Sequence, residues 1–408
     1  MALSNLISVA VVLSVCCLIA SAAPPQAAED HLKKLATASN NLALNLHQKL
    51  SSGSSSNVFF SPFSISTAFG MLYYGARGET AQELRTVLGY EKANLSNQFV
   101  HSSFYRLLTE SIKSGDSDSY VLNAANAILA DKSLQLIANY KREVQALYQA
   151  SVQDVDFAKD GPKIVEEIND WVKAKTNGKI DSLVDELDAS TVLVLLNAVY
   201  FKGTWKTEFD VKKTKPQKFY NNGLESEAKE IPMMHITARF PYTAVYDLQA
   251  LELPYKGENI SMLVLLPENR DGLKALEESL TAEKLATIRQ QLYPTKVIVS
   301  LPKFKVQYSQ ELSGHIQSLG VNKIFRPAAD FSGMTDSKNV YVSQILHKAV
   351  VEVNEKGSEA AAVTGIIGNR IRPIMDFTPS FTADHPFLFA IVDKRSDMIL
   401  FLGRVNVL

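Results

Sequence analysis

The sequence predicts an α+β protein folded as one large domain. Helical patterns fill most of the first half of the chain, and runs of strand length follow one another in the second half. Ile164, Ile168 and Val172 recur every four residues and mark one face of a helix. From Thr191 to Val199 the chain is rich in β-branched and aliphatic residues, as in a strand covered on both faces. Neither an internal repeat nor a long linker divides the 408 residues.

Residues that break helices separate the expected helical segments. A Ser/Gly run at 51–56 ends the first helix, Pro62 suits a first turn, and Gly75 and Gly78 separate two helices. Gly161-Pro162 opens a later helix, which Asn177-Gly178 closes. Helices are therefore expected at 31–50, twice within 62–89, at 161–177 and at 273–292. Strands are expected just before Pro62 and at 191–199, 250–255, 260–266, 296–306, 349–353, 386–393 and 398–404.

The first residues predict export. An apolar run from Leu6 to Ala20 is followed by the small residues Ala20-Ser21-Ala22, which is typical of a secretory signal peptide cut after Ala22. The alternative is an N-terminal membrane anchor, but the run is short for a bilayer span and no basic residues follow it. We therefore expect a signal peptide at 1–22, a mature domain at 23–408, and a secreted, extracellular protein. The sequons at Asn94 and Asn259 predict N-glycosylation.

Composition excludes several classes of function. The net charge of −1 gives no reason to expect binding to nucleic acid or to a membrane surface. Cys16 and Cys17 both lie in the leader, so the mature chain has no disulfide, no thiol nucleophile and no cysteine ligand for a metal. The common hydrolase and nucleotide-binding motifs are absent, and the seven histidines are scattered, so neither an enzyme nor a metal or cofactor site is expected. His347 interrupts an apolar strand in ILHKAVVEV and is expected to be a buried, hydrogen-bonded histidine.

The segment VNEKGSEAAAVTGIIGNRIRP, residues 353–373, has an unusual composition. From Ala360 to Asn369 it contains ten residues without a charge, and most are small or β-branched. In a strand, one face would present Ser358, Ala360, Ala362, Thr364, Ile366 and Gly368, which are small or uncharged enough to be buried. The segment therefore suits either a loop or a strand within a sheet. An ordinary Ala-rich loop or the start of a helix is the alternative.

The stretch EVNEKGSEAAAVTG resembles the reactive-loop hinge of the serpins, and further blocks of that family follow in the family's order. These blocks are NVFFSPFSISTAFGMLYYGARGETAQEL, LLNAVYFKGTWKTEFD, LPKFKV, FSGMT, LHKAVVEVNEKG, DHPFLFAI and FLGRV. The resemblance covers nearly the whole mature chain. It implies helices packed around a large central mixed β-sheet, further sheets, and an exposed reactive loop at about 355–380.

The resemblance also implies a suicide-type inhibitor of serine proteases. A protease attacks the loop and forms an acyl-enzyme, and the freed hinge side inserts into the central sheet as a new strand. The residues that match the family's hinge are Glu355, Gly357, Ser358, Glu359, Ala360, Ala361, Ala362 and Thr364. Those that match the positions where the sheet opens, called shutter and breach, are Ser61, Ser64, Asn197, Trp205 and His347.

Two arguments disagree on the scissile bond. Family spacing counts seventeen residues from Glu355 and gives Ile371–Arg372, which suggests an elastase-like protease. Chemistry favours an arginine, because trypsin-like proteases bind Arg or Lys through a buried acid, and this gives Arg370–Ile371 or Arg372–Pro373. The bond is expected within Arg370 to Arg372, with trypsin-like targets slightly favoured.

Other partners are not expected from the sequence. Lys212, Lys213, Lys215 and Lys218 form a basic run that could contact a sulfated polysaccharide, but a solvated turn is the simpler interpretation. We expect a monomer without strong glycosaminoglycan binding. A non-inhibitory carrier or storage protein on the same fold is the first alternative function. A secreted hydrolase is the second, although it lacks a recognisable nucleophile.

Overall fold

The computed structural model describes residues 25–111, 119–357 and 378–408. Its helices are α2 (Pro25–Ser51), α3 (Pro62–Gly75), α4 (Gly78–Val87), α5 (Asn97–Arg106), α6 (Ala138–Tyr148), α7 (Phe157–Lys175), α8 (Leu273–Ser279), α9 (Ala282–Gln290) and α10 (Ser313–Ser318). Its strands are β1 (Val58–Phe60), β2 (Tyr120–Asp131), β3 (Ser151–Val155), β4 (Leu193–Gly203), β5 (Lys215–Tyr220), β6 (Ala228–Val245), β7 (Leu248–Pro254), β8 (Ile260–Pro267), β9 (Tyr293–Pro302), β10 (Phe304–Glu311), β11 (Gln344–Val353), β12 (Ser380–Thr382), β13 (Phe387–Asp393) and β14 (Met398–Val405). The α+β class is confirmed, and none of these helices is both long and apolar enough to span a membrane.

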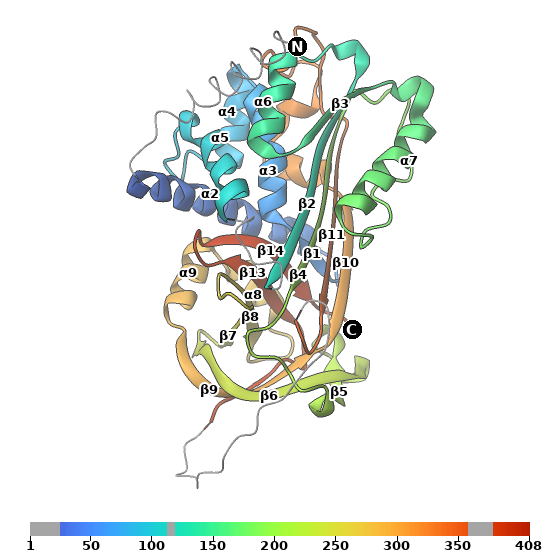
Figure 1. Ribbon diagram of the computed structural model, residues 1–408. Coiled ribbons are helices and arrows are strands. Elements are labelled where there is room, and N and C mark those ends of the chain that lie inside the picture. Colours follow the sequence, from blue (N-terminus) through green and yellow to red (C-terminus); the bar gives the residue numbers. More distant parts are fainter. Residues whose placement is uncertain (1–24, 112–118, 358–377) are drawn as a thin grey trace, which may run out of the picture.

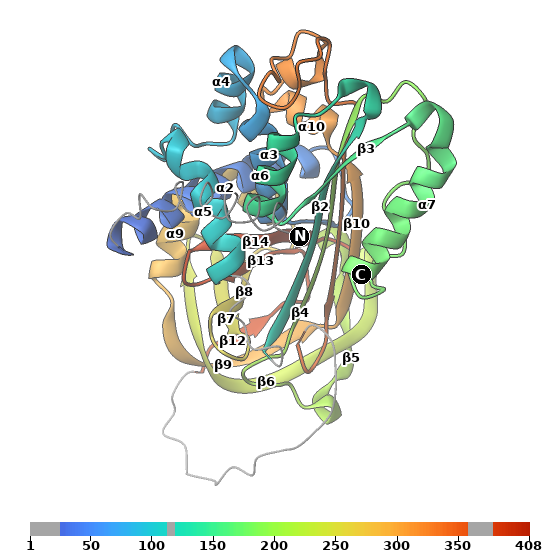
Figure 2. The ribbon, with the colours of Figure 1, turned by 45° about the horizontal axis from the view of Figure 1, so that its top comes forward.

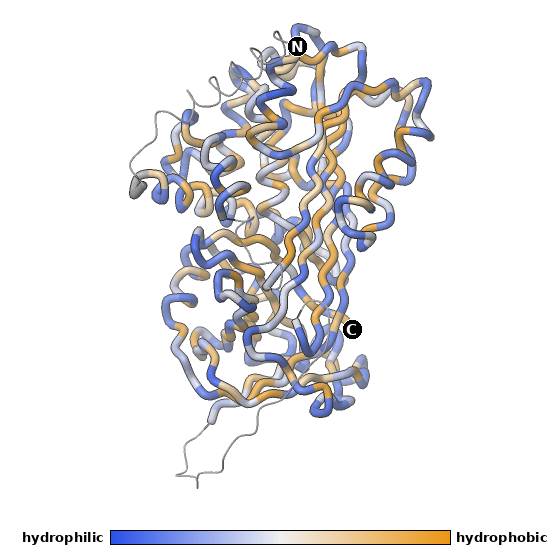
Figure 3. Tube along the Cα trace, in the orientation of Figure 1, coloured by the Kyte–Doolittle hydropathy of each residue, from blue (hydrophilic) through white to orange (hydrophobic). Residues whose placement is uncertain are grey.

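A five-stranded mixed sheet forms the centre of the molecule (Figure 1). Its strand order is β10-β11-β4-β2-β3. β11 runs parallel to β4, whereas the neighbouring pairs β10–β11 and β4–β2 are antiparallel. The long strands of this sheet are largely hydrophobic along their length (Figure 3).

Both faces of this central sheet are covered. On β4, Val194, Leu196 and Ala198 belong to a core shared with Ile164 and Ile168 of α7. The alternate residues of β4 belong to the main core, which lies on the side of α2 and α3. Because successive side chains of a strand point to opposite faces, a doubly covered strand reads as a continuous apolar run. The expectation for 191–199 is therefore confirmed, with the strand displaced to Leu193–Gly203.

A second sheet contains the other nine strands. Its order is β1-β14-β13-β8-β7-β6-β9-β12, and β5 pairs with β6 outside this path. Its strands curve beneath the helices in the lower half of Figures 1 and 2. The two sheets share the main hydrophobic core, where Phe59 stacks on Phe401 and Phe201 packs against Phe401.

Three sequence expectations about the elements are wrong. The run 296–306 is two strands, because Lys303 separates β9 from β10, and these belong to different sheets. The helix expected at 273–292 is two helices, because Leu280 is extended and Thr281 caps α9 by accepting a hydrogen bond from the Lys284 amide. The later helix begins at Phe157 rather than Gly161, since Asp156 caps it, and Pro162 lies inside its first turns.

Candidate functional site: the opening of the central sheet

A row of polar side chains crosses the central sheet at one register position. His347 of β11 is the register partner of Asn197 of β4, and Asn197 is the partner of Asn126 of β2. All three are buried, and Ser61 and Ser64 at the start of α3 meet them from the core side. The structure thus brings together the four predicted shutter residues Ser61, Ser64, Asn197 and His347, and it adds Asn126.

Hydrogen bonds join these residues into one network, here called the shutter network. Asn197 Nδ2 donates to Ser64 Oγ and to Asn126 Oδ1, and Ser64 Oγ donates to Asn126 Oδ1 at 3.2 Å. Ser61 Oγ accepts the Ser64 amide at 3.1 Å, as the N-cap of α3. Ser61 Oγ also donates to the carbonyl of Leu400 in β14 at 2.7 Å. The network therefore ties both central strands to a helix and to the second sheet.

His347 is held in one neutral tautomer. Its Nε2 lies 3.3 Å from the Ser61 amide and accepts that N–H, so its proton is on Nδ1, which donates to Asn197 Oδ1. Burial lowers the pKa of His347 to about 3. A second proton would place two N–H groups against each other at Ser61. The parallel contact between β4 and β11 therefore depends on a neutral His347.

Trp205 closes one end of the same two strands. It lies two residues after the end of β4 and is fully buried, with its ring stacked on Tyr255 at 4.4 Å. Its indole Nε1 donates to the carbonyl of Asn354 at 2.9 Å, and its backbone amide donates to the carbonyl of Lys356 at 2.8 Å. Because Asn354 and Lys356 immediately follow β11, Trp205 fixes the point at which the chain leaves the central sheet.

Glu355 is anchored at this end by both its backbone and its side chain. Its carbonyl accepts the Phe209 amide at 2.8 Å, and its carboxylate accepts from Thr214 Oγ1 at 2.8 Å and pairs with Lys303 at 3.0 Å. Burial alone would raise its pKa, but a backbone amide, Lys303 and Thr214 together keep the pKa of Glu355 below its usual value. Glu355 is thus a buried, charged anchor.

Gly357 is required by the space around it. Its φ is +132°, and a Cβ there would lie 2.0 Å from the carbonyl oxygen of Gly203. The residue forms a β-bridge with Thr204, directly after β4. Only glycine combines that backbone angle with so close an approach.

Several predicted site residues lie outside the described residues. They are Ser358, Glu359, Ala360, Ala361, Ala362, Thr364, Arg370, Ile371 and Arg372. The sequon residue Asn94 is exposed and Asn259 is partly exposed; glycosylation of either stays a prediction.

Sequence reasoning missed three residues of this site. Asn126 interrupts an apolar strand in YVLNAANAILAD, which is the same kind of signal that singled out His347 in ILHKAVVEV. Lys303 and Thr214 meet Glu355 only through the tertiary fold, so no local pattern could reveal them.

The basic run lies beside the Glu355 anchor. Lys212 and Lys213 belong to a single turn at Val211–Lys213, and Lys215 and Lys218 lie on β5. All four are exposed, and Lys218 pairs with Glu225 at 3.1 Å.

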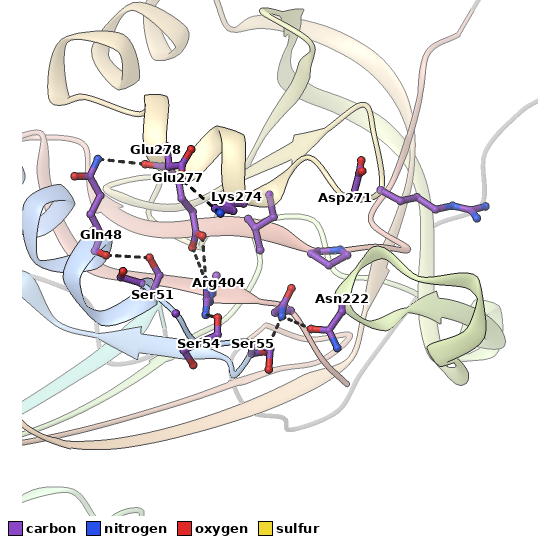
Figure 4. Close-up of a pocket in the computed structure, with 16 residues that line it drawn as sticks. Gln48, Ser51, Ser54, Ser55, Asn222, Asp271, Lys274, Glu277, Glu278 and Arg404 are labelled. Atoms are coloured by element: carbon purple, nitrogen blue, oxygen red, sulfur yellow. Dashed lines mark hydrogen bonds and ion pairs between the residues drawn. The ribbon is translucent and has the colours of Figure 1, made fainter.

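A cavity of about 550 Å³ lies apart from this site, between the end of α2, α8 and β14 (Figure 4). At its floor Arg404 pairs with Glu277 at 3.0 Å, and Glu277 also accepts from His47 at 2.8 Å. Its lining mixes Arg270, Lys274 and Arg404 with Asp271, Glu277 and Glu278, so its charges balance. No cluster of potential metal ligands occurs among the residues that the structure describes.

Known proteins match both the sequence and the fold. The family model Serpin (serine protease inhibitor) matches residues 37–407. Intracellular coagulation inhibitor 2 of Tachypleus tridentatus is 42% identical over 381 residues, covering 92% of this chain and 91% of that protein. Iripin-8 of Ixodes ricinus is also 42% identical, over 382 residues, covering 92% and 94%.

The solved structures agree. A tumour suppressing serpin has a TM-score of 0.82 at 28% identity, covering 92% of this chain and all of that one. Human thyroxine-binding globulin, complexed with thyroxine, has a TM-score of 0.84 at 28% identity, covering 92% and 99%. The chain belongs to the serpin family.

Proposed function

We propose that this serpin is a secreted suicide-type inhibitor of serine proteases. It offers the segment after Gly357 as bait and traps the protease as an acyl-enzyme when that segment enters the central sheet. The observation that carries this proposal is the parallel pairing of β4 with β11, over seven register pairs from Val194–Gln344 to Tyr200–Val350.

A parallel contact at this place can admit another strand. The chain leaves β11 at Val353 and turns at Asn354–Gly357 beside the end of β4. Continuing back between the two strands, it would run antiparallel to both. One parallel ladder would become two antiparallel ladders, which are slightly more stable per residue. The shutter network and the Glu355 anchor lie along this seam, where the strands must part.

The composition of the following segment suits such an insertion. Ser358 to Ile371 is 14 residues, which spans roughly 45 Å at the rise of a strand. Between Ala360 and Asn369 it has no charge and no proline. A buried charge would cost several kcal/mol, and a proline would remove a ladder donor.

The chemistry belongs to the protease. Its serine Oγ attacks the scissile carbonyl, the peptide bond breaks, and the departing amine becomes a new N-terminus on the C-terminal fragment. The acyl ester keeps the protease bonded to the loop. Insertion then moves the protease by about the length of the segment and deforms its active site, so that water no longer cleaves the ester.

The scissile bond is proposed within Arg370 to Arg372, with a trypsin-like target slightly favoured over an elastase-like one. Both arginines offer the charge that a trypsin-like pocket binds. Secretion rests on residues 1–22 and is supported by the two sequons. One relative, intracellular coagulation inhibitor 2 of Tachypleus tridentatus, is named for an intracellular location, so cell fractionation is the direct test of localisation.

The test is incubation of the mature protein with trypsin and, separately, with pancreatic elastase, followed by denaturing gels. Inhibition predicts a band at the summed mass that survives denaturation, and its stronger appearance with one protease assigns the target class. Mass analysis of the released C-terminal fragment identifies the bond. Simple nicking by both proteases without a complex would contradict the proposal and favour a non-inhibitory carrier.

A further inference from the structure

A second cavity, of about 490 Å³, lies between the end of α3, α4 and the start of α5. These helices lie at the opposite end of the molecule from β5 and β9 (Figures 1 and 2). Its lining includes Arg77, Arg85 and Asn97, with Tyr73, Tyr74 and His101 as its aromatic walls. Among the described residues that line it there is no Asp or Glu.

Neither arginine forms an ion pair within the described part of the chain. Arg77 Nη1 donates to the carbonyls of Tyr74 at 2.9 Å and Ala76 at 2.8 Å, and its guanidinium lies against Gly333, where a Cβ would meet it at 2.5 Å. Arg85 Nη1 donates to Asn97 Oδ1, which also accepts from Tyr73. The hydrogen bonds of both guanidinium groups thus go to neutral oxygens, and Arg77 is also close enough to the Asp330 carboxylate to help Ser332 lower the pKa of that group.

The carboxylates near this cavity have other partners. Glu79 of α4 pairs with Lys323, and Glu83 accepts the backbone amides of Asn322 and Lys323 at 2.8 and 2.6 Å. Glu143 accepts from Tyr74 Oη, and Asp330 accepts from Ser332 Oγ at 2.7 Å. None of the four lines the cavity.

The histidine adds no positive charge. His101 Nδ1 lies 2.5 Å from Tyr148 Oη, and burial, followed by the nearby Arg77, lowers the pKa of His101 to about 3. The charge of the lining thus comes from Arg77 and Arg85, two planar groups whose N–H forks fit tetrahedral oxyanions. Because Asn97 Oδ1 accepts two hydrogen bonds, its amide nitrogen remains a further donor.

We propose that this cavity binds a phosphate or sulfate monoester, with the oxyanion at Arg77 and Arg85 and the organic part against the tyrosine rings. The contrast is the cavity of Figure 4, where Arg404 and Arg270 are each neutralised by a glutamate. The lining of that cavity includes three carboxylates, whereas the lining of the cavity at Arg77 and Arg85 includes none, although Asp330 lies beside Gly78.

The test is isothermal titration of the mature protein with phenyl phosphate, phenyl sulfate, inorganic phosphate and inorganic sulfate at constant ionic strength. The expected result is saturable 1:1 binding of at least one aryl ester, tighter than that of the inorganic ion, and the preferred ester assigns the ligand. Arg85→Gln should weaken binding by about tenfold or more, because a charge-assisted hydrogen bond and a full charge are lost.

Arg142→Gln is the matched control, since Arg142 is an exposed arginine of α6 that also donates to an asparagine side chain, Asn139 at 3.0 Å, outside the cavity. It should leave binding unchanged. Arg77→Lys retains a positive charge but not the paired N–H donors of the guanidinium group, so it should weaken binding. Circular dichroism should show that the variant is folded. Equal affinities in Arg85→Gln and Arg142→Gln, or no saturation by any of the four anions at millimolar concentration, would overturn the proposal.

Discussion

His347 allows the shutter network to be tested through pH. In the folded protein burial lowers its pKa to about 3, whereas in the unfolded chain it titrates near its ordinary value of about 6.5. Between these values the unfolded state binds more protons than the folded state, so the free energy of unfolding falls as the pH falls. From pH 7 to pH 5 one such histidine lowers it by about 2 kcal/mol.

His347→Asn removes this dependence while retaining part of the network. The Asn amide can still donate to Asn197 Oδ1, but the acceptor for the Ser61 amide is lost, so we expect lower stability at pH 7. The loss between pH 7 and pH 5 should then be smaller than in the wild type by about 2 kcal/mol.

The assay is urea unfolding at pH 7, 6 and 5. Ser64→Ala is the control, because it removes hydrogen bonds from the same network but no titrating group. It should lower stability by a similar amount at every pH. If His347→Asn loses as much stability between pH 7 and pH 5 as the wild type and Ser64→Ala do, His347 is not a buried neutral group.

Three further changes test the hinge. Lys303→Met should lower the free energy of unfolding by about 1–2 kcal/mol at pH 7, a value reduced because Lys303 is 39% exposed. This loss should become smaller as Glu355 is protonated below its ordinary pKa, and urea unfolding from pH 7 to pH 4 measures it. Gly357→Ala should lower the free energy of unfolding by at least about 2 kcal/mol more than Gly53→Ala, because Gly53 also has a positive φ but has open space around it. Equal losses in the two variants would exclude the close contact between Gly357 and Gly203. Ala362→Arg should leave cleavage by the target protease intact but abolish the covalent band on denaturing gels, since a charge opposes insertion; an undiminished band would contradict this.

The sequence predicted the architecture where the pattern is local. The continuous apolar run after Thr191 indicated a doubly covered strand because both faces of β4 meet apolar neighbours. Gly75 and Gly78 marked the boundary between α3 and α4 correctly. No strand was expected from the sequence at β2, which is stabilised by pairing along its length with β4, a strand distant in sequence.

The same distinction applies to the site. Ser61, Ser64, Asn197 and His347 were selected by resemblance, and the structure joins them through hydrogen bonds that span up to 286 positions in sequence. No local sequence pattern links Glu355 to Lys303. The two residues meet because β10, which begins just after Lys303, pairs with β11, which ends just before Asn354 and Glu355. The roles of the residues from Ser358 to Arg372 remain predictions from composition and resemblance.

The most direct measurement is the melting temperature before and after a single cut between residues 358 and 372 by a metalloprotease, which forms no acyl-enzyme. If the cut segment completes the central sheet, the melting temperature should rise by more than about 10 °C, which for this chain length corresponds to about 8 kcal/mol. An unchanged or lower melting temperature would mean that β4 and β11 do not part to admit the segment, and would contradict the proposed mechanism.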